Sequence, residues 1–124
     1  MNRLISIGLG LLLTCLLQWP SPVAAATWYE TAVSSDRTEH QWVDLDSLLP
    51  KGNDRFEVTS LYENHRSDPP QRSLYRTEYR CHTQEFRDLS RNGNSYQQAW
   101  MTAAGAPLNY ATLKTVCAMG AALR

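Results

Sequence analysis

Residues 73 to 81 show the clearest alternation in the chain between two kinds of side chain, and this alternation restricts the fold more than any other feature. Successive side chains of a β-strand point to opposite faces of the sheet, so a period of two predicts a half-buried strand. One set consists of Tyr75, Thr77, Tyr79 and Cys81, and the other of Arg76, Glu78 and Arg80. We therefore expect a strand over 73–81 with Cys81 pointing inward.

Five further segments have the alternation or the β-branched and aromatic composition of strands: 27–33, 40–45, 55–64, 85–89 and 95–102. Turn-forming residues separate them, and prolines 69 and 70 cannot donate to a strand ladder. Residues 46–50 are expected to form a short turn of helix. The aromatic residues expected in the core are Trp28, Trp42, Phe86, Tyr96 and Trp100. The alternative for the tryptophans at 28, 42 and 100 is that one of them is exposed beside arginines, which would indicate a protein-binding hot spot.

The periodicity changes after Pro107, where apolar side chains recur at spacings of three and four. This spacing predicts one amphipathic helix with an apolar stripe, and Asn109 is a suitable N-cap. The stripe contains Tyr110, Leu113, Val116, Cys117 and Gly120. Together these patterns predict an α+β domain, an antiparallel sheet of about six strands with one C-terminal helix packed on it.

The N-terminus has the order of regions of a secretory signal peptide. Arg3 precedes an apolar run over 4–17, and small residues follow at 24–26. The run is shorter than the roughly 20 residues that a transmembrane helix needs. We expect residues 1–26 to be cleaved, leaving a single domain over 27–124 with no transmembrane segment. The residues before Cys15 match the motif of a lipidation site poorly, so lipidation at Cys15 is the less favoured alternative.

Cleavage would leave two of the three cysteines, Cys81 and Cys117, in a compartment where disulfides persist. We expect them to pair and to tie the C-terminal helix to the inward face of the strand over 73–81. The 12 basic and 12 acidic side chains balance, which argues against a nucleic-acid partner.

Several motifs occur in an order and spacing that resemble the surface-adhesin E family of bacterial exported proteins. They are Trp28, the segment 42–48 (Trp-Val-Asp-Leu-Asp-Ser-Leu), Tyr79-Arg80-Cys81, Phe86-Arg87 and the segment 113–117 (Leu-Lys-Thr-Val-Cys). The resemblance covers nearly all of residues 28–118. It implies a roughly six-stranded antiparallel sheet with a disulfide-linked C-terminal helix, and the family name derives from adhesins that bind host matrix proteins.

No catalytic, cofactor or metal site is expected. Cys81, His82, Cys117 and His40 do not have the spacing of zinc ligands, and a catalytic cysteine would need a free thiolate. Asp44 and Asp46 could serve as a carboxylate pair, but solvated side chains at a strand end are the simpler interpretation. Serine-nucleophile, phosphate-loop and HExxH motifs are absent from the sequence.

Five arginines form the candidate ligand face: Arg72, Arg76, Arg80, Arg87 and Arg91. If their strands pair, the guanidinium groups could bind carboxylates, sulfates or phosphates of a partner. Glu78, Glu85 and Asp88 interrupt the series, so an ordinary surface of salt bridges is the competing interpretation.

The sequence thus predicts a non-enzymatic exported module that binds a protein or an anionic polymer at or outside the cell envelope. The alternative is a small periplasmic accessory or structural protein without an adhesive role. The expected location is the periplasm, the cell surface or the medium.

Overall fold

The computed structural model describes residues 26–123. Cys15 and all but the last residue of the predicted signal peptide lie outside these described residues. Within them, no helix has the length and apolar character required to span a membrane.

All strand pairings in the sheet are antiparallel. Its five principal strands are β1 (Trp28–Val33), β2 (Glu39–Asp44), β4 (Arg55–Asn64), β5 (Gln71–Arg80) and β6 (Glu85–Arg91), which are adjacent in that order. Two-residue strands add to this sheet: β3 (Leu49–Pro50) pairs with β4, while β7 (Asn94–Ser95) and β8 (Met101–Thr102) pair with β6. A short 3₁₀ helix, η2 (Leu45–Ser47), follows β2, and the chain ends in helix α2 (Pro107–Ala122). The predicted α+β class is confirmed, and residues 26–123 contain eight strands where about six were expected.

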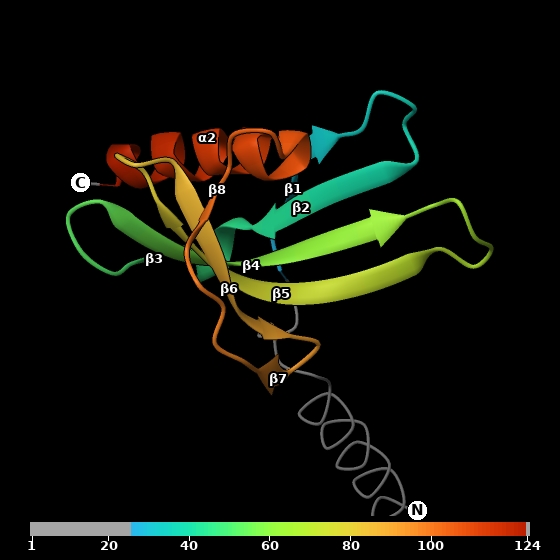
Figure 1. The fold of residues 1–124 in the computed structure, drawn as a ribbon, viewed down its shortest axis with the longest axis horizontal. Coiled ribbons are helices and arrows are strands. Elements are labelled where there is room, and N and C mark those ends of the chain that lie inside the picture. Colours follow the sequence, from blue (N-terminus) through green and yellow to red (C-terminus); the bar gives the residue numbers. More distant parts are fainter. Residues whose placement is uncertain (1–25, 124) are drawn as a thin grey trace, which may run out of the picture.

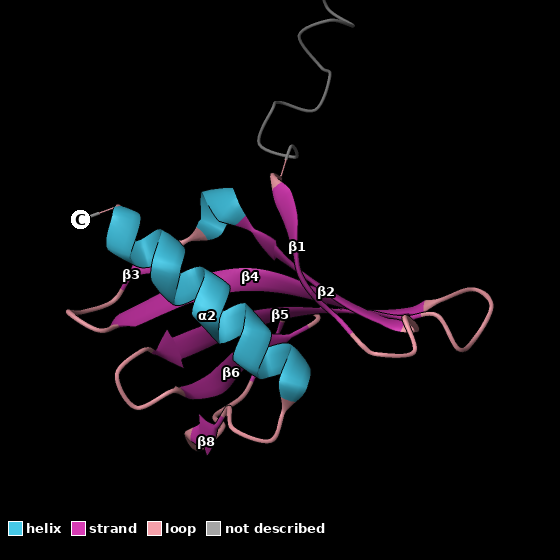
Figure 2. Ribbon diagram, turned by 90° about the horizontal axis from the view of Figure 1, so that it is seen from above, coloured by secondary structure: helices cyan, strands magenta, loops and turns pink. Residues whose placement is uncertain are grey.

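Helix α2 lies across one face of the sheet and contacts β1, β2, β4 and β5 (Figures 1 and 2). The core lies between this helix and the sheet, because the apolar stripe of α2 meets the inward side chains of the strands. It consists of Val43, Phe56, Val58, Tyr79, Phe86, Ala103, Leu113 and Val116. The opposite face of the sheet has no second layer of secondary structure among the described residues (Figure 1). We call it the outer face.

The predicted disulfide is present between Cys81 and Cys117, whose Cα atoms are 5.8 Å apart. Cys81 follows the last residue of β5, and Cys117 lies in the last third of α2. Both cysteines pack against the core cluster. The covalent bond therefore joins the end of a central strand to the helix, as the sequence predicted.

The continuous strand predicted over 95–102 is wrong. Only Ser95 and residues 101–102 pair with β6, and the segment between them is irregular. A side chain explains the interruption: the amide oxygen of Gln98 accepts a hydrogen bond from the backbone N–H of Asp88 at 2.7 Å. This contact occupies a donor of β6 that a continuous neighbouring strand would have used.

The predicted helix start and part of the predicted core also differ from the structure. The residue that precedes α2 is Ala106, without a side-chain cap, and Pro107 occupies the first turn, where its missing N–H costs nothing. Asn109 is therefore not the N-cap. Of the expected core aromatics only Phe86 belongs to the core, whereas Trp28 and Tyr96 are exposed and Trp42 and Trp100 are partly buried outside it.

Removal of the disulfide is expected to destabilise the domain strongly. The bond closes a loop between residues 36 positions apart, for which chain entropy gives about 4 kcal/mol. The double variant Cys81→Ala/Cys117→Ala should therefore unfold at markedly lower urea concentration than the oxidised protein. A reductant should destabilise the wild type and leave the variant unchanged, and equal midpoints for oxidised and reduced wild type would contradict this role.

Gly120→Ala is expected to destabilise the protein although alanine favours helices by about 1 kcal/mol over glycine. A Cβ at position 120 would overlap the ring of Phe56, which is enclosed in the core. Overpacking of this kind costs roughly 1–3 kcal/mol. Thermal unfolding of Gly120→Ala should show a lower midpoint. Gly52→Ala is the control, because its new Cβ would make only ordinary contacts at 3.6 Å with Arg55.

Candidate functional site: the arginine face

Four of the five predicted arginines lie together on the outer face. Arg72, Arg76 and Arg80 alternate along β5, and Arg87 of β6 is on the same side because it pairs with Glu78. The intervening residues Thr77 and Tyr79 are buried on the helix side. We call the surface formed by Arg72, Arg76, Arg80 and Arg87 the arginine face.

The fifth arginine, Arg91, lies on the helix side of the sheet. The register between β5 and β6 shifts between Arg76 and Thr77, so that Leu89 has no partner and Arg91 is opposite Tyr75. Such a bulge reverses the side on which the following side chains project. The Arg91 guanidinium carbon lies 5.7 Å from the centre of the Tyr75 ring. The structure therefore separates Arg91 from the other four arginines.

Two buried carboxylates lie beneath the arginine face, directly opposite each other on neighbouring strands. Glu57 of β4 pairs with Glu78 of β5, and only 6% and 3% of their surfaces are exposed. Like charges in this position repel each other, and each charge also loses hydration when it is buried. Cations close to both carboxylates are therefore required for this pair to be stable.

Each of these glutamates has two cationic partners. Glu57 forms ion pairs with Arg76 and with Lys51, whose Nζ is 3.7 Å away. Glu78 accepts from Nε of Arg87 at 3.2 Å, and its Oε1 is 3.0 Å from Nη2 of Arg87 and 3.7 Å from Nη1 of Arg55. Each negative charge is thus paired with two positive charges. The cationic side chains are nearer to solvent than the glutamates.

A third buried carboxylate, Glu63 of β4, is bound by Arg72 and Trp42. Its Oε2 accepts from Nε of Arg72 at 2.7 Å, and its Oε1 accepts from Nε1 of Trp42 at 2.8 Å. The hydrogen bond from Arg72 is the main reason that the pKa of Glu63 is lowered, with burial opposing it. Trp42 thus lies on the outer face, where its indole N–H donates to a charged partner.

Trp100 gives the arginine face an aromatic component. The guanidinium carbons of Arg80 and Arg87 lie 3.9 Å and 4.4 Å from the centre of its ring. Such cation–π contacts hold planar guanidinium groups over an aromatic surface. The aromatic composition had suggested a core position for Trp100, whereas the structure places it beside the arginines.

Sequence reasoning missed three residues of this surface. Lys51 and Arg55 belong to the ion pairs, and Leu74, 43% exposed, lies between Arg72 and Arg76 on the same side of β5. The alternation of β5 could have identified Leu74, because it falls in the arginine set. The turn-forming residues 52–54 indicate a bend before β4, but no local pattern indicates the pairing of β3 with β4 beside Lys51.

The other chemical candidates have structural roles. Cys81 and Cys117 are bonded to each other, so neither supplies a thiolate for catalysis or metal binding. Asp44 caps η2 by accepting from the backbone N–H of Asp46, and Oδ2 of Asp46 accepts from the Thr27 hydroxyl. Within residues 26–123 there is no group of three or more acidic, histidine or cysteine side chains arranged to hold a metal ion.

Comparison with known proteins gives one match. A family model described as surface adhesin-E family matches residues 31–123. No curated protein and no solved structure matches the chain. The matched range includes the whole arginine face and both cysteines of the disulfide.

Arg72→Gln is expected to raise the pKa of Glu63 towards the ordinary value for a carboxyl group, because it removes the hydrogen bond that lowers this pKa. A depressed native pKa adds stability above the unfolded-state pKa, and this stability is lost as the pH falls through the native pKa. The variant should therefore lose less stability than wild type on acidification below about pH 5. Carboxyl ¹³C NMR titration and urea unfolding at several pH values check this, and an unchanged Glu63 pKa would contradict it.

Proposed function

The chain belongs to the surface adhesin-E family, and on that premise we propose that it is an exported, non-enzymatic binding module whose arginine face contacts acidic groups of a protein partner. Membership is consistent with a surface adhesin-like role. One observation supports the proposal most strongly. On this face the carboxylates of Glu57, Glu63 and Glu78 are buried, whereas the arginine side chains paired with them are more exposed to solvent.

The charge balance of this surface favours an acidic partner. Its ion pairs contain six cations, Lys51, Arg55, Arg72, Arg76, Arg80 and Arg87, and four carboxylates, Glu57, Glu63, Glu78 and Glu85. The cationic side chains are considerably more exposed than Glu57, Glu63 and Glu78. An approaching carboxylate would therefore meet donors first, and a guanidinium can donate two parallel hydrogen bonds to it.

The apolar and aromatic parts of the surface favour a protein over a simple polyanion. Leu74 is exposed between Arg72 and Arg76, and the Trp100 ring packs against the guanidinium groups of Arg80 and Arg87. Arginine and tryptophan are enriched among the residues that dominate the binding energy of protein interfaces. A sulfated polymer would form ion pairs with the cations, but contact with the apolar side chain of Leu74 would add little to its binding energy.

The double variant Arg76→Gln/Arg87→Gln tests the proposal with little risk to folding. It removes two charges from the arginine face but leaves each buried glutamate one cation, Lys51 for Glu57 and Arg55 for Glu78. Binding to purified extracellular-matrix proteins of differing isoelectric point, and to heparin, is measured by surface plasmon resonance. We expect wild type to bind at least one acidic protein, and the variant to bind it about tenfold or more weakly.

The matched control is Arg37→Gln/Lys114→Gln, which also removes two exposed charges, in the β1–β2 turn and on α2. It should bind like wild type. Added salt should weaken wild-type binding, because the contacts are between exposed charges. Binding of heparin alone would identify an anionic polymer as the partner, and equal binding by wild type and Arg76→Gln/Arg87→Gln would exclude the arginine face.

A further inference from the structure

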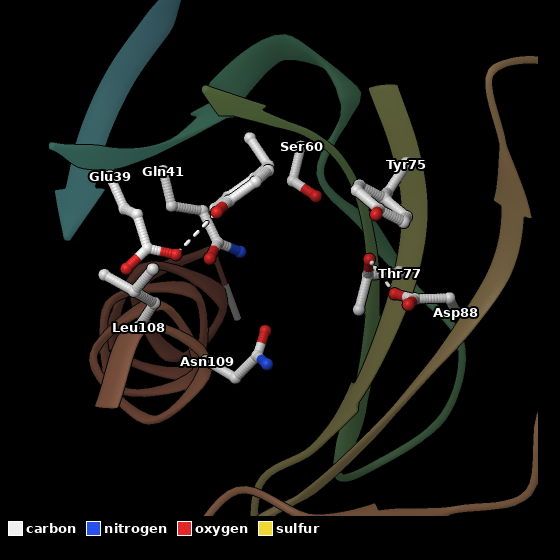
Figure 3. A pocket seen from close by; sticks show the side chains of 9 residues that line it. Glu39, Gln41, Ser60, Tyr75, Thr77, Asp88, Leu108 and Asn109 are labelled. Carbon is white, nitrogen blue, oxygen red and sulfur yellow. Dashed lines mark hydrogen bonds between the residues drawn. The ribbon is translucent and has the colours of Figure 1, made fainter. Parts of the chain in front are cut away.

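A polar cleft lies on the helix side of the sheet, where α2 begins, on the opposite side from the arginine face. It encloses about 310 Å³ between the first residues of α2 and strands β2, β4, β5 and β6 (Figure 3). The residues that line it are Glu39, Gln41, Ser60, Tyr62, Tyr75, Thr77, Asp88, Leu108 and Asn109. Helix α2 does not extend over the ends of β4 and β5 at the turn between these two strands (Figures 1 and 2).

Two of the most buried polar side chains in the cleft have no partner for their polar atoms. Gln41 is 8% exposed and Ser60 is 1% exposed, and neither side chain makes a hydrogen bond with any residue in 26–123. The amide of Gln41, the hydroxyl of Ser60 and the amide of Asn109 project into the same space (Figure 3). Because these amide and hydroxyl groups have no side-chain hydrogen bond within the described residues and face the cleft, they are available to donate to and accept from a ligand.

The two carboxylates of the cleft lie at its sides, and each already has a partner. Oε1 of Glu39 accepts from the hydroxyl of Tyr62 at 2.5 Å. Oδ1 of Asp88 accepts from Thr77 at 2.8 Å, and burial raises the pKa of Asp88. Each carboxylate retains lone pairs that can accept from a ligand. No lysine or arginine lines the cleft, although Arg66 is 3.6 Å from Oε2 of Glu39 and Arg91 lies beside Tyr75. Two carboxylates lie at its sides, so the cleft is unsuited to an anion.

The donors and acceptors of this cleft match a neutral ligand with many hydroxyl groups. Amides and hydroxyls both donate and accept, as sugar hydroxyls do, and the flanking carboxylates can accept further hydrogen bonds from them. Tyr62 and Tyr75 add aromatic carbon, against which the C–H face of a sugar ring can pack. A cationic ligand is less suited, because the unpartnered groups at the centre are neutral and the carboxylates are separated.

We propose that the cleft binds one neutral sugar residue, as a free monosaccharide or as the end of a glycan, through Gln41, Ser60 and Asn109. The volume is at the lower end of the roughly 300–1,000 Å³ typical of ligand pockets. It therefore accommodates a single ring and not an extended oligosaccharide. The site is independent of the arginine face and of the function proposed for it.

The test is an NMR titration of the ¹⁵N-labelled oxidised protein with glucose, galactose, mannose, fucose and N-acetylglucosamine. At least one sugar should give saturating shifts in the amides around Gln41, Ser60 and Asn109. The variant Ser60→Ala/Asn109→Ala removes two of the three ligand-binding side chains and should weaken binding at least about fivefold. Circular dichroism and thermal unfolding establish that this variant is folded.

Lys114→Gln, on an exposed position of α2, is the control and should bind like wild type. Arg76→Gln/Arg87→Gln should also bind the sugar normally. This result separates the test of sugar binding at the cleft from the test of protein binding at the arginine face. Three results would overturn the proposal: no saturation with any of the five sugars, unchanged affinity in Ser60→Ala/Asn109→Ala, or shifts at the cleft produced by lysine or sulfate and by none of the sugars.

Discussion

A single helix covers only one face of the sheet, so the other face must be stable in water without a second layer. A row of apolar side chains there would be a large exposed hydrophobic patch. The chain instead places Glu57 and Glu78 opposite each other under a cover of cations. Those cations are required for stability because they neutralise charges that have lost much of their hydration. The same requirement leaves positive groups at the surface, where they are available to a partner.

The disulfide completes this arrangement on the helix side. It links the residue after β5 to α2, and β5 is also the strand that carries most of the arginine face. The helix therefore cannot separate from the sheet without opening or distorting the domain. Nearer the start of α2, the hydroxyls of Thr112 and Thr31 of β1 are hydrogen-bonded at 2.7 Å, and the polar cleft lies between the first turn of the helix and the strands. The two binding surfaces that we propose thus use opposite faces of one rigid layer.

The differences between prediction and structure arise where a non-local contact overrides a local pattern. Alternation over 85–91 would place Arg87 and Arg91 on the same face, but the bulge at Leu89 reverses the projection of Arg91. Aromatic composition suggested a strand through Trp100, but the Gln98 side chain takes a backbone donor of β6. Trp42 and Trp100 were assigned to the core because tryptophan is largely apolar, yet both lie against charged groups of the outer face.

The sequence alone determined the principal strands, the C-terminal helix and the pairing of Cys81 with Cys117. The spacing of apolar residues indicates the strands and the helix, and the number of cysteines indicates the disulfide. It also identified the arginines of β5 as one row, since alternate residues of a strand share a face. Only the tertiary structure decided which carboxylates those arginines neutralise, that Arg91 is separate from them, and that a cleft forms beside Asn109. These features depend on strand register and helix position, which bring together residues from several elements that no local pattern connects.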